Sequence, residues 1–376
     1  MSSSTGQTRR QIALVVHDFS PGFGQGRYCV ELARRLAPLH DIHIYANHFG
    51  VPCEPSWTYQ RIPAWRRSAL LTILTFLAQS SRRIQPWRFD LVHAQGLTCW
   101  RADVITAHVC NAARVEKDAL RSPRERLFDT LAGQLEMEFY RRNLNAHWIA
   151  VSQQTARELE TSHLPAHPVE VIYHGVDTDQ FRPAIESAHK RALRENLGLP
   201  TNRWLWLFVG EASKGLLPTM QALKKFPQAT LLVISRSSAT DWLAKADNLG
   251  VLSQVLWPGP QASMAAFYQA ADVFVYPSRY DAFGMVVAEA MSAGLPVIVN
   301  QGIGAAEWVQ HGENGLRGDF SQSTALLAAL QQLAALPDRG VHLGENARLT
   351  ARGHTWQRCA EATLKVYEQT WKPLTP

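Results

Sequence analysis

Two series of short hydrophobic runs, each run followed by sequence with helical spacing, organise the chain. The first series occupies positions 12–16, 41–46, 90–95, 103–108, 147–152 and 169–174, and the second 204–210, 230–235, 255–259, 272–278 and 295–300. Strands that alternate with helices predict βαβ units and mostly parallel sheets covered on both faces. Two such series predict an α/β fold with two Rossmann-like domains.

A polar, turn-rich stretch, 175–190, separates the two series and is the natural place for a hinge. We therefore expect an N-terminal domain at 1–177 and a C-terminal domain at 178–354. The remaining residues, 355–376, hold a predicted helix. One stripe of this helix contains Trp356, Cys359, Ala360, Thr363, Leu364, Tyr367 and Trp371. That spacing predicts a face packed against another element.

The net charge of +6 lies entirely in the first half of the chain. Residues 1–150 contain 19 Lys and Arg against 12 Asp and Glu, whereas residues 151–376 contain 19 against 20. A basic half favours an anionic partner, although a merely solubilising surface explains it as well. The five cysteines have no CxxC spacing, which favours reduced thiols over disulfides or a zinc site. No segment has the roughly 18 apolar residues that span a membrane. We expect a cytoplasmic protein.

Ligands of open parallel sheets bind beyond the carboxyl ends of the strands, so the loops there are the candidates for chemistry. The loop HDFSPGFGQGR at 17–27 has three glycines before a helix, with Arg27 at its end. Glycines and free helix amides suit a phosphate group, while a tight turn is the competing interpretation. In the second domain, Lys214 precedes Gly215 at the end of a strand. Lys214 is either a diphosphate ligand or a solvated surface lysine.

The segment SRYDAFGMVVAEAMSAGLPVIV, 278–299, places Asp281 before a predicted helix and Glu289 in its second turn. The first amides of such a helix lack intrahelical partners and can hold a diphosphate. The residues concerned are Phe283, Gly284, Met285 and Val286. Carboxylates accept hydrogen bonds from vicinal diols, so each acid can hold a sugar or a ribose. The competing interpretation has Asp281 capping the helix and Glu289 on its surface.

Taken in order, these motifs resemble retaining nucleotide-sugar glycosyltransferases of family 4. The resemblance covers nearly the whole chain and is carried by FGQGRYCVELARRL, VIYHGVDTDQFRP, AMSAGLPVIV and the acid–seven–acid spacing of Asp281 and Glu289. It implies the GT-B architecture, in which two Rossmann-like domains face a central cleft and the last helix crosses back to the first domain.

The resemblance also implies roles for individual residues. Gly24 and Arg27 would flank the donor diphosphate from the first domain, and Lys214 would contact it from the second. Glu289 would bind the ribose, while Asp281 and the amides of 283–286 would hold the transferred sugar and phosphate. His108 would lie near that sugar. We expect no metal and no cofactor apart from the donor substrate, a UDP- or GDP-linked sugar, because cations and helix amides stabilise the departing diphosphate.

Three positions depart from the family pattern. Asp281 stands where Glu is usual, Glu211 stands where Arg is usual, and His174 stands where Asn is usual. The second departure leaves the phosphate contact to Lys214 alone or to Lys214 together with Arg236. Each departure makes the identity of the sugar harder to predict.

The expected function is retaining, metal-independent hexosyl transfer to a glycan or lipid-linked acceptor, as in cell-envelope polysaccharide or lipopolysaccharide synthesis. Residues 61–88 place arginines and tryptophans around an apolar stretch, a pattern that suits either the inner, anionic face of the plasma membrane or a buried helix. Alternatives are a sugar-nucleotide epimerase and a non-catalytic sugar-nucleotide binding protein. Nothing resembles a nucleic-acid-binding module.

Overall fold

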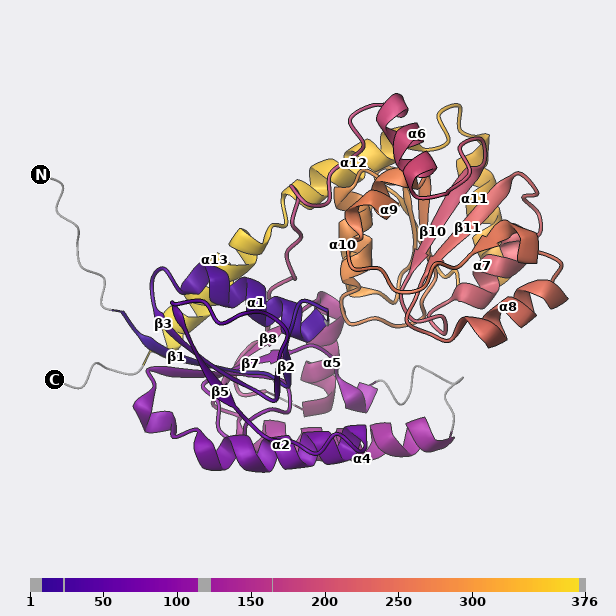
Figure 1. The fold of residues 1–376 in the computed structure, drawn as a ribbon. Helices are drawn as coiled ribbons and strands as arrows, with labels where there is room; N and C mark the ends of the chain where they lie inside the picture. The colour runs from indigo at the N-terminus through magenta and orange to yellow at the C-terminus, as the bar shows by residue number, and fades with distance from the viewer. Residues whose placement is uncertain (1–8, 23, 114–122, 164, 372–376) are drawn as a thin grey trace, which may run out of the picture. The chain divides into compact units, whose positions relative to one another are not determined.

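A computed structural model describes residues 9–22, 24–113, 123–163 and 165–371. The chain divides into two compact units (Figure 1). The N-terminal unit contains residues 1–174 and 356–376, and the C-terminal unit contains residues 175–355. The last helix therefore belongs to the first unit. The N-terminal part of the first unit ends at His174, three residues before the expected domain boundary at 177. The second unit begins with the turn-rich stretch.

The N-terminal unit is built on a seven-stranded parallel sheet in the order β5-β3-β1-β6-β7-β8-β9. Its strands are β1 (Gln11–Val15), β3 (Asp41–Ala46), β5 (Trp57–Arg61), β6 (Leu91–Gln95), β7 (Val104–Ala107), β8 (His147–Ala150) and β9 (Glu170–Val171). A small second sheet pairs β2 (Asp18–Phe19) with β4 (His48–Phe49). The central strands β1, β6 and β7 are buried almost throughout, as strands covered on both faces must be.

Helices cover both faces of this sheet. They are α1 (Gly24–Leu36), α2 (Ala69–Arg83), η1 (Pro86–Arg88), α4 (Pro123–Arg142), α5 (Gln153–His163) and α13 (Trp356–Thr370). Figure 1 shows α1 and α13 on one face, with α2 and α4 on the other. Helix α13 packs against α1 through the predicted stripe, where Trp356, Thr363 and Tyr367 are buried.

The C-terminal unit has a six-stranded parallel sheet in the order β12-β11-β10-β13-β14-β15. The strands are β10 (Trp204–Val209), β11 (Ala229–Ile234), β12 (Val255–Leu256), β13 (Val273–Tyr276), β14 (Val297–Asn300) and β15 (Leu316–Gly318). The helices are α6 (Ser187–Asn196), α7 (Leu216–Leu223), α8 (Ala239–Asn248), η2 (Leu252–Gln254), α9 (Ala265–Ala270), α10 (Met285–Ser292), η3 (Gly304–Trp308), α11 (Ser323–Ala335) and α12 (Val341–Arg352). The two units confirm the predicted α/β class and its parallel sheets.

All eleven hydrophobic runs contain a strand, but four strands are not predicted by them. Three are β2, β4 and β15, which have two or three residues each and lie outside the hydrophobic runs. The fourth, β5, lies at the edge of its sheet and carries mostly exposed residues, so it lacks a hydrophobic run. Across the described ranges, no helix combines the length and the apolar character that crossing a bilayer requires.

Candidate functional site

The loops after β10 and β13 bring Lys214 and Asp281 into direct contact. These two strands are parallel neighbours, so their carboxyl ends meet at one edge of the sheet. Lys214 Nζ lies 2.6 Å from Asp281 Oδ2, and the Tyr276 hydroxyl donates to the same oxygen over 2.9 Å. The two charged side chains retain 34% and 19% exposure, which leaves both open to a ligand.

Tyr276 is the positioning residue of this pair and was not predicted from the sequence. Burial, and then the negative charge of Asp281, hold the pKa of Tyr276 well above its ordinary value. Its hydroxyl therefore stays protonated and remains a donor to the carboxylate. The only available signal in the sequence was its position at the end of a predicted strand.

Two glycines shape the loops that carry the pair. Gly215 and Gly284 have φ values of +104° and +83° and precede α7 and α10, respectively. A Cβ atom at Gly215 would lie 2.7 Å from Pro277, and one at Gly284 would lie 2.7 Å from Ile303. A side chain at either position would combine backbone strain with a steric clash. Both turns therefore require glycine.

The first turn of α10 presents unused amides. Within the described residues, the N–H groups of Gly284, Met285 and Val286 donate no hydrogen bond, and the Val287 amide donates to Gly284 O at 2.9 Å. Phe283 is buried against Trp308, and its carbonyl accepts from the Ala305 amide. The N-cap is Gly284 and no side chain caps the helix, so Asp281 does not act as a cap. Such an end favours an anion.

Glu289 lies in the second turn of α10 and is only 6% exposed, which rules out a surface position. The Tyr268 hydroxyl donates to Glu289 Oε2 over 2.8 Å. A buried carboxylate is costly unless polar groups satisfy it. Tyr268, on α9, thus helps to fix the orientation of the Glu289 carboxylate. The sequence analysis missed Tyr268, because α9 is short and follows no motif of its own.

Arg236 and Glu211 complete the loops of this half of the site. Arg236 is exposed and follows β11, the strand next to β10. Glu211, which replaces the usual arginine, accepts a hydrogen bond from Ser237 Oγ at 2.9 Å. The hydrogen bond between Ser237 and Glu211 therefore links the loop after β11 to the loop after β10.

In the N-terminal unit, α1 begins at Gly24, and Arg27 is partly buried in its first turn. Among the residues described, the backbone N–H groups of Gly24, Gln25 and Gly26 donate no hydrogen bond, whereas the side-chain amide of Gln25 donates to Gln95 O at 2.5 Å. Gly26 is essential to this turn, since a Cβ atom there would lie 2.3 Å from Asp18 O. This helix start has the features expected of a phosphate contact.

His108 follows β7 and forms part of a chain of hydrogen bonds. Its Nε2 lies 2.8 Å from Gln95 Oε1, and its Nδ1 lies 3.3 Å from His174 Nε2. Burial, followed by the neighbouring charge of His174, lowers the pKa of His108 well below its ordinary value. Burial, and then Arg27, lower the pKa of His174 to about 3. Both rings are therefore neutral near pH 7. Because His108 Nε2 donates to Gln95 Oε1, His108 Nδ1 carries no proton and accepts a hydrogen bond from His174 Nε2.

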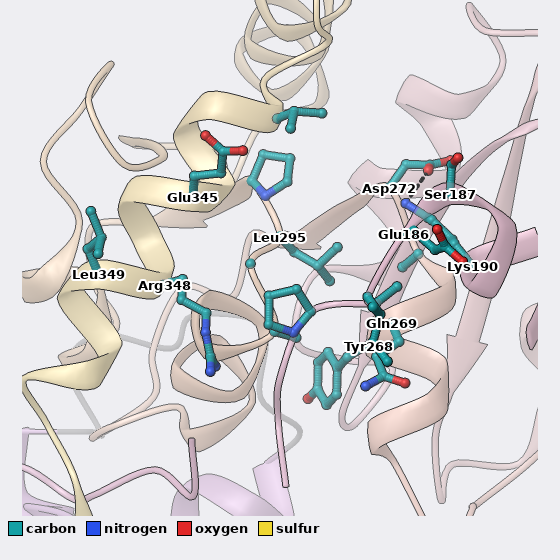
Figure 2. A pocket seen from close by; sticks show the side chains of 18 of the residues that line it. Glu186, Ser187, Lys190, Tyr268, Gln269, Asp272, Leu295, Glu345, Arg348 and Leu349 are labelled. Carbon is teal, nitrogen blue, oxygen red and sulfur yellow. Dashed lines mark ion pairs between the residues drawn. The ribbon is translucent and has the colours of Figure 1, made fainter. Parts of the chain in front are cut away.

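Figure 2 shows a different cavity, of about 620 Å³, within the C-terminal unit. It is lined by residues of α6, α9 and α12, including the ion pair of Lys190 and Asp272 at 2.7 Å. None of the predicted donor residues lines it. Tyr268 lines this cavity and also donates a hydrogen bond to Glu289, so the cavity adjoins the residue that orients this acid.

Both parts of the chain match known protein families. Residues 24–180 match the family described as Glycosyltransferase Family 4, and residues 189–350 match Glycosyl transferases group 1. A D-inositol 3-phosphate glycosyltransferase of Segniliparus rotundus is 31% identical over 75% of this chain and 67% of its own. One of the same name from Xylanimonas cellulosilytica is 36% identical over 54% of this chain and 52% of its own, so the chain spans about half of that relative.

Among solved structures, WaaG, a glycosyltransferase involved in lipopolysaccharide biosynthesis, superposes with a TM-score of 0.82. The match covers 95% of this chain and 99% of WaaG at 19% identity, a likeness of fold. The fold is GT-B. The sequence matches and the two Rossmann-like units together place this chain in the family 4, group 1 glycosyltransferases.

Proposed function

We propose that the protein transfers a hexose from a nucleoside diphosphate sugar to a hydroxyl of an acceptor, with retention of the anomeric configuration. The observation that carries this proposal is the arrangement around α10. A buried acid, Glu289, follows a helix start whose amides donate no hydrogen bond within the described residues, beside the Lys214–Asp281 pair. This set offers an anion site flanked by carboxylates, which suits a diphosphate carrying two sugars.

In the proposed complex, the diphosphate accepts hydrogen bonds from the amides of α10 and from Lys214. Lys214 has three donors, so it can contact phosphate while it keeps Asp281. Glu289 accepts from the ribose diol, and Asp281 accepts from a hydroxyl of the transferred sugar. Charge that develops on the leaving diphosphate is thereby stabilised by groups that are already oriented.

In the proposed mechanism, no side chain acts as a nucleophile. The acceptor hydroxyl attacks the anomeric carbon on the face from which the diphosphate departs, and its proton passes to a phosphate oxygen. One glycosidic bond forms as one bond to phosphate breaks. Asp281 and Glu289 are binding groups, unlike the acid and nucleophile pair of a retaining glycosidase.

For the acceptor we propose a phosphorylated molecule. The first 150 residues carry the whole positive excess, 19 basic against 12 acidic side chains. Two of the relatives are named for a phosphorylated polyol, D-inositol 3-phosphate. A phosphate on a soluble polyol and a phosphate on a lipid-linked glycan offer the same charge. The exposed surface of α2 favours the lipid-linked glycan as the acceptor.

Helix α2 leaves an apolar surface uncovered. Leu71 and Leu74 are 38% and 42% exposed, and Trp65 and Trp87, which flank the helix, are 66% and 76% exposed. Its last turn carries Arg82 and Arg83. Exposed leucines and tryptophans beside arginines are typical of a segment that lies on an anionic membrane. We propose that this surface brings the enzyme to a lipid-linked acceptor.

The test begins with UDP-, GDP- and ADP-sugars, read by thermal shift, since a ligand bound only by the native state raises the melting temperature. The stabilising donor is then incubated with D-inositol 3-phosphate or a lipid extract of cell envelopes. Formation of an α-glycoside from an α-linked donor supports the proposal. Turnover without acceptor would indicate an epimerase, and stabilisation without turnover with either acceptor would indicate a binding protein.

The membrane surface is tested separately by sedimentation with vesicles of phosphatidylglycerol or phosphatidylcholine. We expect binding to the anionic vesicles only, and loss of binding in the variant Leu71→Glu/Leu74→Glu. The variant Leu252→Glu, at an exposed leucine of the C-terminal unit, serves as the control and should still bind. Equal sedimentation of the α2 variant and the control would remove α2 from the proposal.

A further inference from the structure

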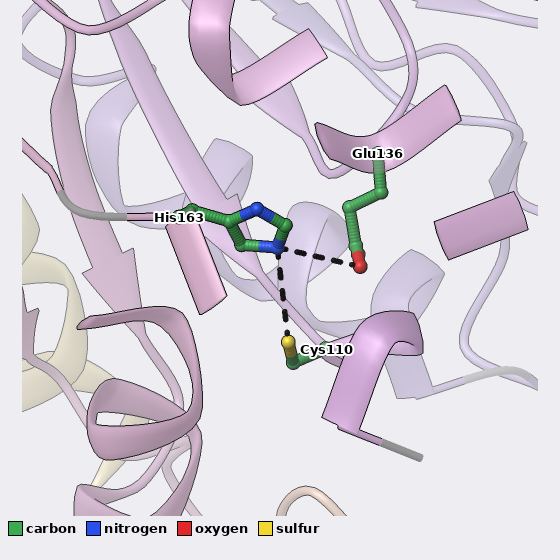
Figure 3. A group of neighbouring side chains, drawn as sticks. All are labelled: Cys110, Glu136 and His163. Carbon is green, nitrogen blue, oxygen red and sulfur yellow. Dashed lines mark hydrogen bonds and ion pairs between the residues drawn. The ribbon is translucent and has the colours of Figure 1, made fainter. Parts of the chain in front are cut away.

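Cys110, Glu136 and His163 form a buried cluster in the N-terminal unit. Cys110 follows β7, Glu136 lies in α4, and His163 is the last residue of α5. Figure 3 shows the imidazole Nε2 facing both the thiol and the carboxylate. Nε2 lies 3.8 Å from Cys110 Sγ and 3.6 Å from Glu136 Oε2, and all three ligand atoms lie within 4.8 Å of one another. None of these residues belongs to the proposed donor site.

The cluster places a carboxylate in the interior of the unit. Cys110 has no exposed surface, Glu136 is 3% exposed, and the His163 side chain is 1% exposed. Within the described residues, no lysine or arginine forms an ion pair with Glu136. Its partners are the Asn111 side-chain amide at 3.1 Å, the Ala112 N–H at 3.2 Å and His163. A buried carboxylate is costly without a cation or several hydrogen bonds.

We propose that Cys110 Sγ, Glu136 Oε2 and His163 Nε2 bind a divalent zinc ion. Tetrahedral zinc holds sulfur at about 2.3 Å and nitrogen or oxygen at about 2.0–2.2 Å, so its ligand atoms lie roughly 3.3–3.7 Å apart. The two separations from His163 Nε2, 3.8 Å to Cys110 Sγ and 3.6 Å to Glu136 Oε2, lie at or close to that range. The sulfur and the carboxylate oxygen lie within 4.8 Å of each other and would move closer together when the ion binds. A thiolate and a carboxylate also balance the two charges of the ion.

Neighbouring groups already orient the ligands. Asn111 and Ala112 hold the carboxylate of Glu136, and the Tyr140 ring stacks on His163 with centroids 4.6 Å apart. Outer hydrogen bonds of the kind made to Glu136 are usual around bound zinc, whereas His163 Nδ1 has no hydrogen-bond partner among the described residues. Three protein ligands leave a fourth position for water. The ion would join the end of β7 to α4 and α5, and so stabilise this part of the N-terminal unit.

The sequence analysis favoured reduced thiols over a zinc site. Zinc motifs are recognised by ligands a few residues apart, whereas these three ligands come from three separate elements. The alternative to a metal is a hydrogen-bonded His163–Glu136 pair beside a neutral thiol. Burial, and then the charge of Glu136, raise the pKa of Cys110 to about 11, so the metal-free thiol would be protonated at pH 7.

The test uses the full chain without an affinity tag, expressed with zinc and dialysed against zinc-free buffer. We expect about one equivalent of zinc by elemental analysis, a lower melting temperature after chelation, and recovery when Zn²⁺ alone is returned. Co²⁺ in its place should give a thiolate-to-cobalt charge-transfer band. Cys110→Ser and His163→Asn should lose the metal and the band, whereas Cys99→Ser, at another buried thiol of this unit, should keep both.

Wild-type protein that retains no zinc, shows no charge-transfer band with Co²⁺ and does not gain stability from Zn²⁺ would overturn the proposal. Retention of the metal and the band by Cys110→Ser would overturn it as well. If Cys110→Ser does not fold, Glu136→Gln, which keeps the side-chain shape, takes its place. In that variant we expect weaker zinc retention and a smaller thermal shift, and unchanged values would contradict the assignment.

Discussion

Asp281 Oδ2 accepts hydrogen bonds from both Lys214 and Tyr276, so the acid and the base of this site act as one unit. Removing Asp281 would free Lys214 to move, and removing Lys214 would leave Asp281 with a neutral partner. Glu289 is similarly fixed by Tyr268. At the scale of the residue, each of the two predicted acids has a tyrosine that orients it, and both tyrosines are buried.

We expect Glu289→Ala to weaken donor binding by at least about 100-fold, because two charge-assisted hydrogen bonds contribute roughly 1.5–3 kcal/mol each. Tyr268→Phe keeps the acid but not its orientation, and should weaken binding about tenfold. Calorimetric titration with the stabilising donor measures both. Glu313→Ala, at an exposed acid of the same unit, is the control. Unchanged affinity in Glu289→Ala with an intact fold would refute the assignment of this residue.

Lys214→Met should also weaken donor binding, by roughly 10- to 100-fold, since it removes one cation from the diphosphate and keeps the aliphatic stem. Free nucleoside diphosphate should lose about as much affinity as the intact donor, because the contact is to phosphate. A nucleoside without phosphates should bind both proteins equally. Equal diphosphate affinity of variant and wild type would exclude Lys214 from the phosphate contact.

At the scale of the element, α13 completes the core of the N-terminal unit from the far end of the chain. The Tyr367 hydroxyl lies 2.6 Å from His93 Nδ1, and Thr363 Oγ1 lies 3.4 Å from the Tyr28 hydroxyl. His93 has no exposed surface, and its other nitrogen lies 2.7 Å from Thr106 Oγ1. The stripe on this helix therefore includes polar groups that hydrogen-bond inside the core.

Tyr367→Phe should lower the free energy of unfolding by about 1–3 kcal/mol, because it leaves a buried nitrogen of His93 without its partner. Urea denaturation followed by circular dichroism measures the change. Glu368→Gln, on the exposed face of the same helix, should change it by less than about 0.5 kcal/mol. Identical midpoints for Tyr367→Phe and the wild type would show that this hydrogen bond does not contribute to stability.

At the scale of the whole molecule, buried histidines are concentrated in one unit. Burial is the largest cause that lowers the pKa of His17 to about 4, of His93 to about 3 and of His174 to about 3, and all three belong to the N-terminal unit. In the unfolded chain these side chains take up protons near pH 6.5. Between pH 6.5 and about 3 to 4, the unfolded state therefore binds more protons than the native state, and stability falls as the pH is lowered.

Acidification from pH 7.5 to pH 5 should destabilise the N-terminal unit by up to about 2 kcal/mol for each of these histidines. The ordinary pKa values of Asp and Glu lie near 4, below this interval, whereas that of histidine lies within it. Hydrogen exchange followed by mass spectrometry should show faster exchange, corrected for intrinsic rates, in 9–22 and 91–107 than in the sheet of the C-terminal unit. Equal losses of protection in both units would contradict the assignment to these histidines.

Local periodicity was sufficient for much of the fold. Each of the eleven hydrophobic runs contains a strand, and the stripe on α13 predicted a packed face, because burial on a sheet or helix leaves a repeat in the sequence. Periodicity did not predict the edge strand β5 or the exposed leucines of α2, since partial burial leaves no clear repeat in the sequence. For the same reason, the sequence left open the choice between a buried helix and a membrane surface at 61–88, and the membrane surface is a proposal that rests on the exposed fractions of individual side chains.

The sequence by itself determined the α/β class, the order of the strands along the chain, and the acids at 281 and 289 with their helix start, because these features depend on short-range order. Only the tertiary structure decided which distant groups meet: Tyr268 with Glu289, Tyr276 and Lys214 with Asp281, His174 with His108, and Cys110 with Glu136 and His163. Such contacts join loops and helices that a parallel sheet brings to one edge. No local pattern encodes them, because crossover connections separate neighbouring strands by many residues.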